Sequence, residues 1–165
     1  MTALQVQVRK VRKSDIDRIV DIERSWYHLS HWSIDSYYRL LNDDGFTTSF
    51  VAESEDETGR LTIVGFVIFH VAAGVSEIYN IAVDSGHARQ GIGRRLLASA
   101  IEESEKRNAT RIVLEVRKSN AGAIHFYDEF HFVVIGERRN YYSNPIEDAF
   151  VMEYKIPESG WRFQS

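Results

Sequence analysis

The sequence predicts a single α/β (α+β) domain with a mixed, mainly antiparallel central sheet flanked by helices. Three observations predict it: strand-like segments come early, a strand-helix-strand crossover follows, and two further strands close the pattern. At 165 residues the chain has the usual size of one domain with one core. We place the domain at residues 1–156 and expect residues 157–165, from Pro157 onward, to form a loose tail.

The beginning of the chain is expected to form a strand and two short helices. Residues 6–11 alternate between apolar and polar side chains, which indicates a strand. Residues 14–17 have the composition of a capped helix start, and the apolar residues of this helix share one face: Ile16, Ile19 and Val20. A second short helix is expected after Ser33.

Three apolar runs then predict the centre of the sheet. Residues 49–52 and 61–71 are separated by a charged stretch, residues 53–60, which we expect to be a solvated hairpin loop. Residues 76–83 are expected to pair with residues 61–71 across a turn near Gly74. Together these runs predict an antiparallel meander.

The second half of the chain supplies the crossover and the closing strands. An amphipathic helix follows the glycines at 91 and 93, with a buried stripe of Ile92, Leu96, Leu97, Ala100 and Ile101. Residues 110–117 alternate, so that Glu115 lies in the middle of a strand. Ser119 and Asn120 precede a helix that carries Ile124, Phe126, Tyr127 and Phe130, and strands are expected at residues 132–137 and 148–154.

Composition excludes several classes of protein. Without an apolar run of about eighteen residues or a signal-peptide core, we expect a cytoplasmic protein that does not enter a membrane. The absence of cysteine excludes disulfides and cysteine nucleophiles. The net charge of -4 argues against direct nucleic-acid binding and leaves a basic protein partner open. His28 and His31 lack a third ligand nearby, so we expect no metal site.

The loop between residues 83 and 95 has the pattern of an anion-binding site. It reads Arg89-Gln90-Gly91-Ile92-Gly93-Arg94 and lies between a strand and the start of a helix. The first amides of a helix have no intrahelical acceptor, and the helix dipole adds about half a positive charge there. A phosphate can accept hydrogen bonds from these amides and is attracted by the positive end of the dipole. Glycines let the phosphate approach the amides, because they carry no side chain. The alternative is an ordinary glycine-rich turn, since a lone Gly-x-Gly is a weak signal.

Two familiar phosphate loops do not fit this pattern. A dinucleotide-binding fingerprint requires a third glycine where Leu96 stands, and the phosphate loop of nucleotide hydrolases requires Gly-Lys-Ser or Gly-Lys-Thr. The remaining interpretation is a ligand with a pyrophosphate and an extended arm that lies beside the preceding strand. Acyl-coenzyme A has that shape.

Several motifs occur in a fixed order between residues 77 and 152. They are Asn80-Ile81-Ala82-Val83, Arg89-Gln90-Gly91-Ile92-Gly93-Arg94, Leu114-Glu115-Val116-Arg117, Ser119-Asn120, Ala123-Ile124, Phe126-Tyr127, Arg138-Arg139-Asn140-Tyr141-Tyr142 and Asp148-Ala149. Together they resemble the GNAT superfamily of N-acetyltransferases, and within it the RimI-type ribosomal-protein-alanine N-acetyltransferases. The resemblance implies a GNAT-like sheet. Two positions depart from the family pattern: Ala88 replaces a usual Gln or Arg, and His131 replaces a usual Gly.

The resemblance implies two catalytic residues. Glu115 matches the family's proton acceptor, and Tyr127 matches the proton donor to the departing coenzyme A sulfur. From the residues alone, Glu115 is explained as well by a salt bridge to Arg111 or Arg117, and Tyr127 by packing among neighbouring aromatic side chains.

The resemblance also implies the binding residues. The acetyl-CoA contacts would come from Ile81, Ala82, Val83, Arg89, Gln90, Gly91, Ile92, Gly93, Arg94 and Asn120. The acceptor would be bound by Arg138, Tyr141 and Tyr142. The alternatives are a core strand for residues 81–83, a plain helix cap for Asn120, and an exposed hairpin for the last three residues.

The function implied by the resemblance is transfer of an acetyl group from acetyl-CoA to a protein N-terminal α-amine. The implied acceptor is the N-terminal alanine of the eighteenth small-subunit ribosomal protein. Two alternatives stay open: a broader Nα-, lysine or small-amine acetyltransferase, and a non-catalytic acyl-CoA-binding module. The sequence does not specify an oligomeric state.

Overall fold

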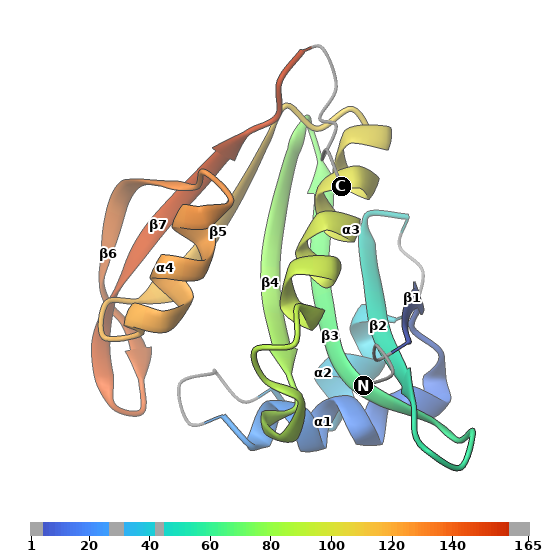
Figure 1. Cartoon of the computed structure of the whole chain (residues 1–165). Helices are drawn as coiled ribbons and strands as arrows, with labels where there is room; N and C mark the ends of the chain where they lie inside the picture. Colours follow the sequence, from blue (N-terminus) through green and yellow to red (C-terminus); the bar gives the residue numbers. More distant parts are fainter. Residues whose placement is uncertain (1–4, 27–31, 42–44, 159–165) are drawn as a thin grey trace. The chain divides into compact units, whose positions relative to one another are not determined.

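The computed structural model of the chain describes residues 5–26, 32–41 and 45–158. Seven strands form one sheet in the order β1-β2-β3-β4-β5-β7-β6 (Figure 1). The strands are β1 (Val6–Lys10), β2 (Thr47–Glu55), β3 (Leu61–Ala72), β4 (Val75–Val83), β5 (Arg111–Arg117), β6 (Val133–Ser143) and β7 (Ile146–Lys155). The α-helices of the described residues are α1 (Ile16–Arg24), α2 (Ile34–Leu40), α3 (Ile92–Lys106) and α4 (Ala121–Glu129).

Strand directions confirm the predicted fold class. The pairs β1–β2, β2–β3, β5–β7 and β6–β7 are antiparallel, and β4–β5 is parallel. The parallel pair is the crossover predicted from the strand-helix-strand pattern. None of the helices in the described part of the chain is long and apolar enough to cross a membrane.

The chain's contacts divide it into two compact units. Unit 1 comprises Met1–His70 and Asn80–Ala100, and unit 2 comprises Val71–Tyr79 and Ile101–Ser165. The division therefore falls within β3, β4 and α3. The predicted domain boundary at residue 156 stays a prediction, and residues 159–165 of the expected tail lie outside the described residues.

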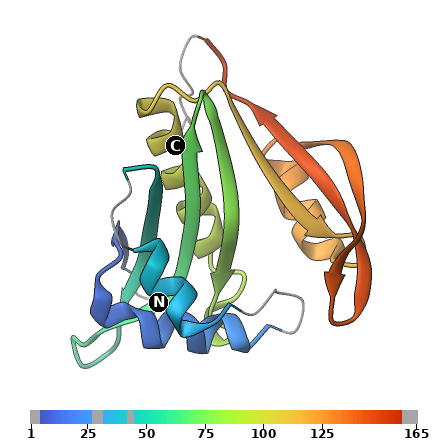
Figure 2. The ribbon, with the colours of Figure 1, turned by 180° about the vertical axis from the view of Figure 1, so that it is seen from behind.

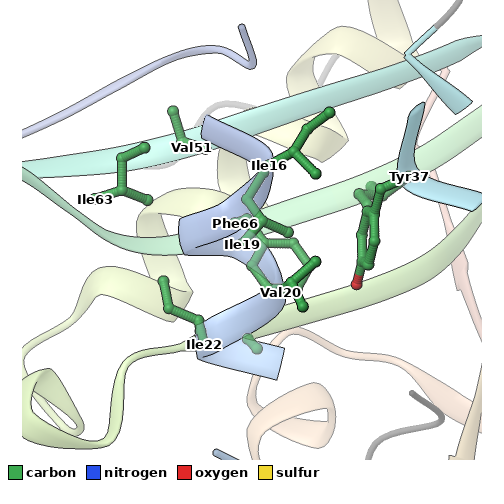
Figure 3. Packing of buried hydrophobic residues seen from close by; sticks show 10 residues of the cluster. Ile16, Ile19, Val20, Ile22, Tyr37, Val51, Ile63 and Phe66 are labelled. Carbon is green, nitrogen blue, oxygen red and sulfur yellow. The ribbon is translucent and has the colours of Figure 1, made fainter. Parts of the chain in front are cut away.

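Unit 1 buries its core between β2, β3 and the two N-terminal helices. The predicted stripe of Ile16, Ile19 and Val20 is buried, and these side chains pack against Phe66 of β3 and Tyr37 of α2 (Figure 3). Figure 2 shows α1 and α2 on this face of β3, and α3 covers the opposite face in Figure 1. Unit 1 is therefore a three-layer helix-sheet-helix arrangement.

The helix starts differ in detail from the prediction. A 3₁₀ turn at Lys13–Asp15 precedes α1, and the Asp15 carboxylate accepts a hydrogen bond of 2.6 Å from the Arg12 N–H. Asp15 thus closes the 3₁₀ turn, and no side-chain hydrogen bond among the described residues caps α1 itself. At α2 the prediction is confirmed, because the Ser33 hydroxyl accepts from the Ser36 N–H at 3.2 Å.

The charged stretch at residues 53–60 is only in part the solvated loop that we predicted. β2 continues to Glu55, and the side chain of Glu53 is buried. Glu53 forms an ion pair with Arg9 of β1, and this contact lowers the pKa of the Glu53 carboxyl. The prediction was wrong here because a β1 partner, distant in sequence, supplies a cation that makes burial of the carboxylate tolerable.

Unit 2 contains the parallel strand pair and the closing hairpin. Residues 75–78 of β4 pair in register with residues 111–114 of β5, and β7 lies between β5 and β6. The alternation predicted for β5 is confirmed, since Ile112, Leu114 and Val116 are buried. Across the turn before β4, Ala73 and Gly74 both have positive φ (49° and 77°), as a two-residue hairpin turn requires.

Candidate active site

The glycine loop of unit 1 presents an open helix start. Gly91 has φ of 78° and its carbonyl accepts the first helical bond of α3, from the Arg95 N–H at 3.1 Å. The side chains of Arg89 and Gln90 are exposed, and a Cβ added at Gly91 would meet no protein atom within 4 Å. The turn is therefore not filled by its own side chains. Its accessible amides and arginines suit a diphosphate.

Close packing holds this helix start in place. Ile92 and Leu96 are buried, and both lie against Gly65 of β3. A Cβ at Gly65 would lie 2.9 Å from Leu96 Cδ1 and 3.0 Å from the Ala82 carbonyl oxygen. A larger residue at this position would force Leu96 or the strand to shift, so Gly65 favours the close approach of α3 that positions the loop. Sequence reasoning missed Gly65, because its neighbours come from β4 and α3.

The outer end of β4 carries the residues expected to bind the acyl arm. The β4–β5 ladder ends at Ile78, so Ile81, Ala82 and Val83 lie beyond it. Ala82 is buried, whereas Ile81 and Val83 are partly exposed. The Val83 carbonyl accepts from the Trp26 indole N–H at 2.7 Å, which ties this end of β4 to the second residue after α1.

A buried polar group, which the sequence reasoning did not single out, lies next to these residues. The Glu23 side chain is fully buried and accepts from the Asn80 amide at 3.0 Å and from the Trp32 N–H at 3.2 Å. Burial, with Glu23 nearby, raises the pKa of the Tyr37 hydroxyl. A carboxyl group on the apolar face of a helix is the available sequence signal, since such a group is buried only with partners.

In unit 2, Glu115 lies largely buried on the face of β5 that also carries Arg117. Its carboxylate forms an ion pair of 2.9 Å with the Nε of Arg138 on β6. Burial raises the pKa of Glu115, Arg138 opposes this, and the nearby carboxylate of Glu77 adds to the rise. The salt-bridge alternative is thus realised with Arg138, and not with Arg111 or Arg117 as we had considered.

The three residues expected to bind the acceptor lie in a strand and not in a loop. We predicted the strand to end near residue 137, but β6 continues to Ser143. Arg138 lies opposite Ala149, and Tyr142 lies opposite Glu147. Between these pairs β6 advances by four residues while β7 advances by two. Two extra residues form a bulge there. Asn140 adopts φ of 49° in it, and its N–H donates to the Asp148 carboxylate at 2.8 Å.

The bulge brings two tyrosines beside cationic groups. The rings of Tyr141 and Tyr142 meet edge-to-face with centroids 5.0 Å apart. The Arg138 guanidinium lies 5.7 Å from the Tyr141 centroid, and the Arg117 guanidinium lies 4.1 Å from that of Tyr142. Arg117 is almost fully buried and also donates to the carbonyls of residues 144 and 145. It therefore braces the end of the β6–β7 hairpin.

Tyr127 lies on α4 within an aromatic cluster, as the packing alternative predicted. Its ring contacts Phe126 and Phe132 with centroid distances of 5.3 and 5.6 Å. Burial raises the pKa of the Tyr127 hydroxyl, and the nearby Tyr142 raises it further. The hydroxyl therefore stays protonated through neutral pH.

Asn120 has the position that the sequence predicted. It precedes α4 as the N-cap, and its side-chain oxygen accepts from the Ala123 N–H at 3.2 Å. This contact is the plain helix cap considered above.

The structure therefore gathers the predicted residues in two groups. In unit 2, Glu115, Arg138, Tyr141 and Tyr142 form one cluster, and Tyr142 also contributes to the raised pKa of Tyr127. In unit 1, the glycine loop and the outer end of β4 meet through the Gly65 contacts. No group of three His, Cys, Asp or Glu side chains among the described residues could hold a metal ion, and His28 and His31 lie outside those residues.

The chain matches a family model over residues 16–132, that of the acetyltransferase (GNAT) family. The chain belongs to this family. As a member of the GNAT family it is an acyltransferase, and acetyl-CoA is the acetyl donor of the family.

Relatives and a solved structure extend the match. A Bacillus subtilis (strain 168) protein, provisionally named a ribosomal protein bS18-alanine N-acetyltransferase, is 33% identical over 92% of this chain and 96% of its own length. The ribosomal protein bS18-alanine N-acetyltransferase of Escherichia coli (strain K12) is 43% identical over 57% of this chain and 65% of its own length. The crystal structure of the ribosomal-protein-S18-alanine N-acetyltransferase from Escherichia coli superposes with a TM-score of 0.80 at 30% identity, covering 98% and 100% of the two chains.

The two departures of this GNAT chain from the family pattern have local explanations. His131 takes the left-handed position that ends α4, with φ of 64°, and the Phe132 N–H donates to the Tyr127 carbonyl at 3.1 Å. His131 therefore ends α4 in the left-handed conformation that a glycine usually adopts at a helix end. Ala88 is exposed and has extended backbone ahead of the loop.

Proposed function

We propose that this GNAT chain transfers the acetyl group of acetyl-CoA to the N-terminal α-amine of a protein, with the N-terminal alanine of ribosomal protein bS18 as its acceptor. The observation that carries the proposal is the match to the bS18-alanine N-acetyltransferases, which spans nearly the whole chain in two comparisons. We infer that the reaction takes place in the cytoplasm, where a ribosomal protein would be met.

The chemistry of the amine supports an N-terminal acceptor. An α-amino group titrates near pH ~8, whereas a lysine side chain titrates near ~10.4. An α-amine thus needs only modest help to lose its proton. In the proposal Glu115 gives this help as general base, directly or through a water molecule, and its raised pKa makes it a stronger base than an exposed carboxylate.

Tyr127 is proposed as the general acid that protonates the coenzyme A sulfur. Its raised pKa keeps the hydroxyl protonated, and burial that disfavours a phenolate also makes a thiolate more basic. A proton held at the Tyr127 oxygen is therefore available as the carbon–sulfur bond breaks. Tyr141 and Tyr142 are proposed to contact the acceptor peptide.

The donor is proposed to bind through main chain more than through side chains. The loop at residues 89–94 would hold the pyrophosphate, with Gln90, Gly91, Ile92 and Gly93 offering amides and Arg89 and Arg94 offering charge. Residues 81–83 would bind the pantetheine arm and the thioester oxygen. Asn120 would contact the arm beyond its role as a helix cap.

The direct test is release of coenzyme A thiol with acetyl-CoA and a peptide panel. The panel contains Ala-, Ser- and Met-initiated peptides, the first with the bS18 N-terminal sequence, and an N-blocked lysine peptide. We expect the bS18 peptide to give the highest kcat/KM and mass spectrometry to place the acetyl group on its α-amine. Preference for the lysine peptide would contradict the proposed acceptor, and acetyl-CoA binding without turnover of any peptide would indicate a binding module.

A further inference from the structure

Glu115 and Arg138 are unequally exposed. The Glu115 side chain is 11% exposed, and that of Arg138 is 57% exposed. Burial removes water from the Glu115 carboxylate and so disfavours its charge, whereas the exposed Arg138 guanidinium keeps much of its hydration. The cation therefore offsets a desolvation cost that falls mainly on the carboxylate.

The register of unit 2 explains how Arg138 reaches Glu115. Arg117, Ala149 and Arg138 lie in one row across β5, β7 and β6, and Glu115 lies in the adjacent row opposite Val151. Directly paired residues share a face of the sheet, so Arg138 and Glu115 project to the same side. The small side chain of Ala149 lets the guanidinium cross β7. The bulge that follows Arg138 places the Tyr141 ring beside the same guanidinium.

Few other charged groups face Glu115. Glu77 approaches from β4, Arg138, Tyr141 and Tyr142 from β6, and β7 places the apolar Val151 opposite it. Among these charged side chains Arg138 favours ionisation of Glu115 and Glu77 opposes it, and a backbone hydrogen bond at Glu115 also favours the ionised form.

We propose that Arg138 is a positioning residue for Glu115: its guanidinium keeps the carboxylate ionised and oriented until the cationic α-ammonium of the acceptor replaces it. The inference rests on the proposed function and deepens it, because it assigns Arg138 to the base rather than to the peptide. Replacement of the Arg138 guanidinium by the α-ammonium costs little free energy, because the exposed guanidinium is hydrated again as it leaves. The incoming ammonium then lies beside the group that removes its proton.

The test compares Arg138→Gln, Arg138→Lys and the matched control Arg139→Gln, which changes the adjacent exposed arginine. The pH profile of kcat/KM for the bS18 peptide is the first readout. For Arg138→Gln we expect the acidic limb to move up by about one pH unit, because an opposite charge shifts a carboxyl pKa by at least that much. We expect Arg138→Lys to restore the limb and Arg139→Gln to leave it in place.

Measurements of kcat/KM above the acidic limb distinguish a role of Arg138 in positioning Glu115 from a role in binding the peptide. Above the limb Glu115 is ionised in every variant, so Arg138→Gln should reach or exceed the wild-type kcat/KM, because the competing guanidinium is gone. A loss of equal size at every pH would overturn the proposal and favour direct peptide contact. An unchanged profile would overturn it as well.

A measurement without turnover keeps the inference separate from the proposed function. The Glu115 carboxyl carbon can be titrated by NMR in the wild-type chain and in Arg138→Gln, with Glu115→Gln to assign the signal. We expect a higher Glu115 pKa in Arg138→Gln. If no peptide is acetylated, the proposed acceptor fails but this titration still decides on Arg138, and equal pKa values in the two proteins would overturn its role.

Discussion

The two units of the chain prepare their parts of the proposed reaction by different means. In unit 1 the candidate donor site consists largely of main chain at a helix start, held by the close packing of Ile92 and Leu96 on Gly65. In unit 2 the candidate catalytic groups are side chains on β5, β6 and α4 whose charges influence one another. Main-chain sites depend on backbone shape, and side-chain sites depend on neighbouring charge.

The burial of polar groups follows the same division. Glu23 and Asn80 of unit 1 are buried and hydrogen-bonded, which suits a fixed support beneath the outer end of β4. Glu115 of unit 2 is largely buried, but its partner Arg138 is exposed, so an arriving ligand can replace the cation beside the carboxylate. Variants in unit 1 should therefore affect donor binding and stability, and variants in unit 2 should affect turnover and its pH dependence.

The largest expected effect is that of Gly91→Val on donor binding. Gly91 has φ of 78°, a conformation that costs a non-glycine residue about 1–2 kcal/mol, and a branched side chain would project where the phosphates are proposed to lie. Acetyl-CoA should raise the melting temperature of the wild-type chain and not that of Gly91→Val, as differential scanning fluorimetry can show. Gly45→Val is the matched control, because Gly45 has φ of 75° and equally open surroundings. A normal acetyl-CoA shift in Gly91→Val would remove the loop from the donor site.

Glu115→Gln and Tyr127→Phe should lower turnover and leave donor binding nearly unchanged, the reverse of the effect expected for Gly91→Val. Each variant keeps the shape of the side chain and removes the proton transfer, so we expect kcat to fall by about tenfold or more with little change in the Kd for acetyl-CoA. Because burial raises the Glu115 pKa, its ionised form is disfavoured in the fold, and loss of the charge should leave stability unreduced at neutral pH. Single-turnover kinetics and calorimetry measure the two quantities. Normal turnover in both variants would contradict their assigned roles.

The sequence predicted the parts of the molecule that depend on local periodicity. The buried stripe of α3, the alternation of β5 and the cap at Asn120 are all confirmed, because each follows from spacing within one element. The burial of Glu53 and the pairing of Arg138 with Glu115 were not predicted. Each depends on a partner on another strand, and the second also depends on the strand register beside a two-residue bulge. Contacts of this kind are decided by register and twist, which a single sequence does not display.

Asn80→Ala tests the buried support of unit 1. Its loss removes the donor at 3.0 Å from the buried Glu23 carboxyl, and we expect the free energy of unfolding to fall by about 1–3 kcal/mol. Urea denaturation measures the change. The control is Asp21→Asn, an exposed position on α1, the helix that carries Glu23. We also expect a weaker acetyl-CoA shift, because Asn80 adjoins residues 81–83. A loss of stability with unaltered donor binding would mean that this support does not reach the donor site.

The smallest expected effect is a gain of stability at the end of α4. His131 has φ of 64°, a conformation with a steric cost for histidine and none for glycine. Glycine loses more backbone entropy on folding, which cancels part of this advantage. His131→Gly should therefore stabilise the protein by up to about 1 kcal/mol. Asn108→Gly at the end of α3 provides the comparison, since Asn108 has φ of 60° and asparagine tolerates this conformation better than histidine. Its gain in urea denaturation should be smaller. If His131→Gly gained no stability while kcat changed, His131 would belong to the catalytic side of unit 2, and the corner after α4 would be more than a helix stop.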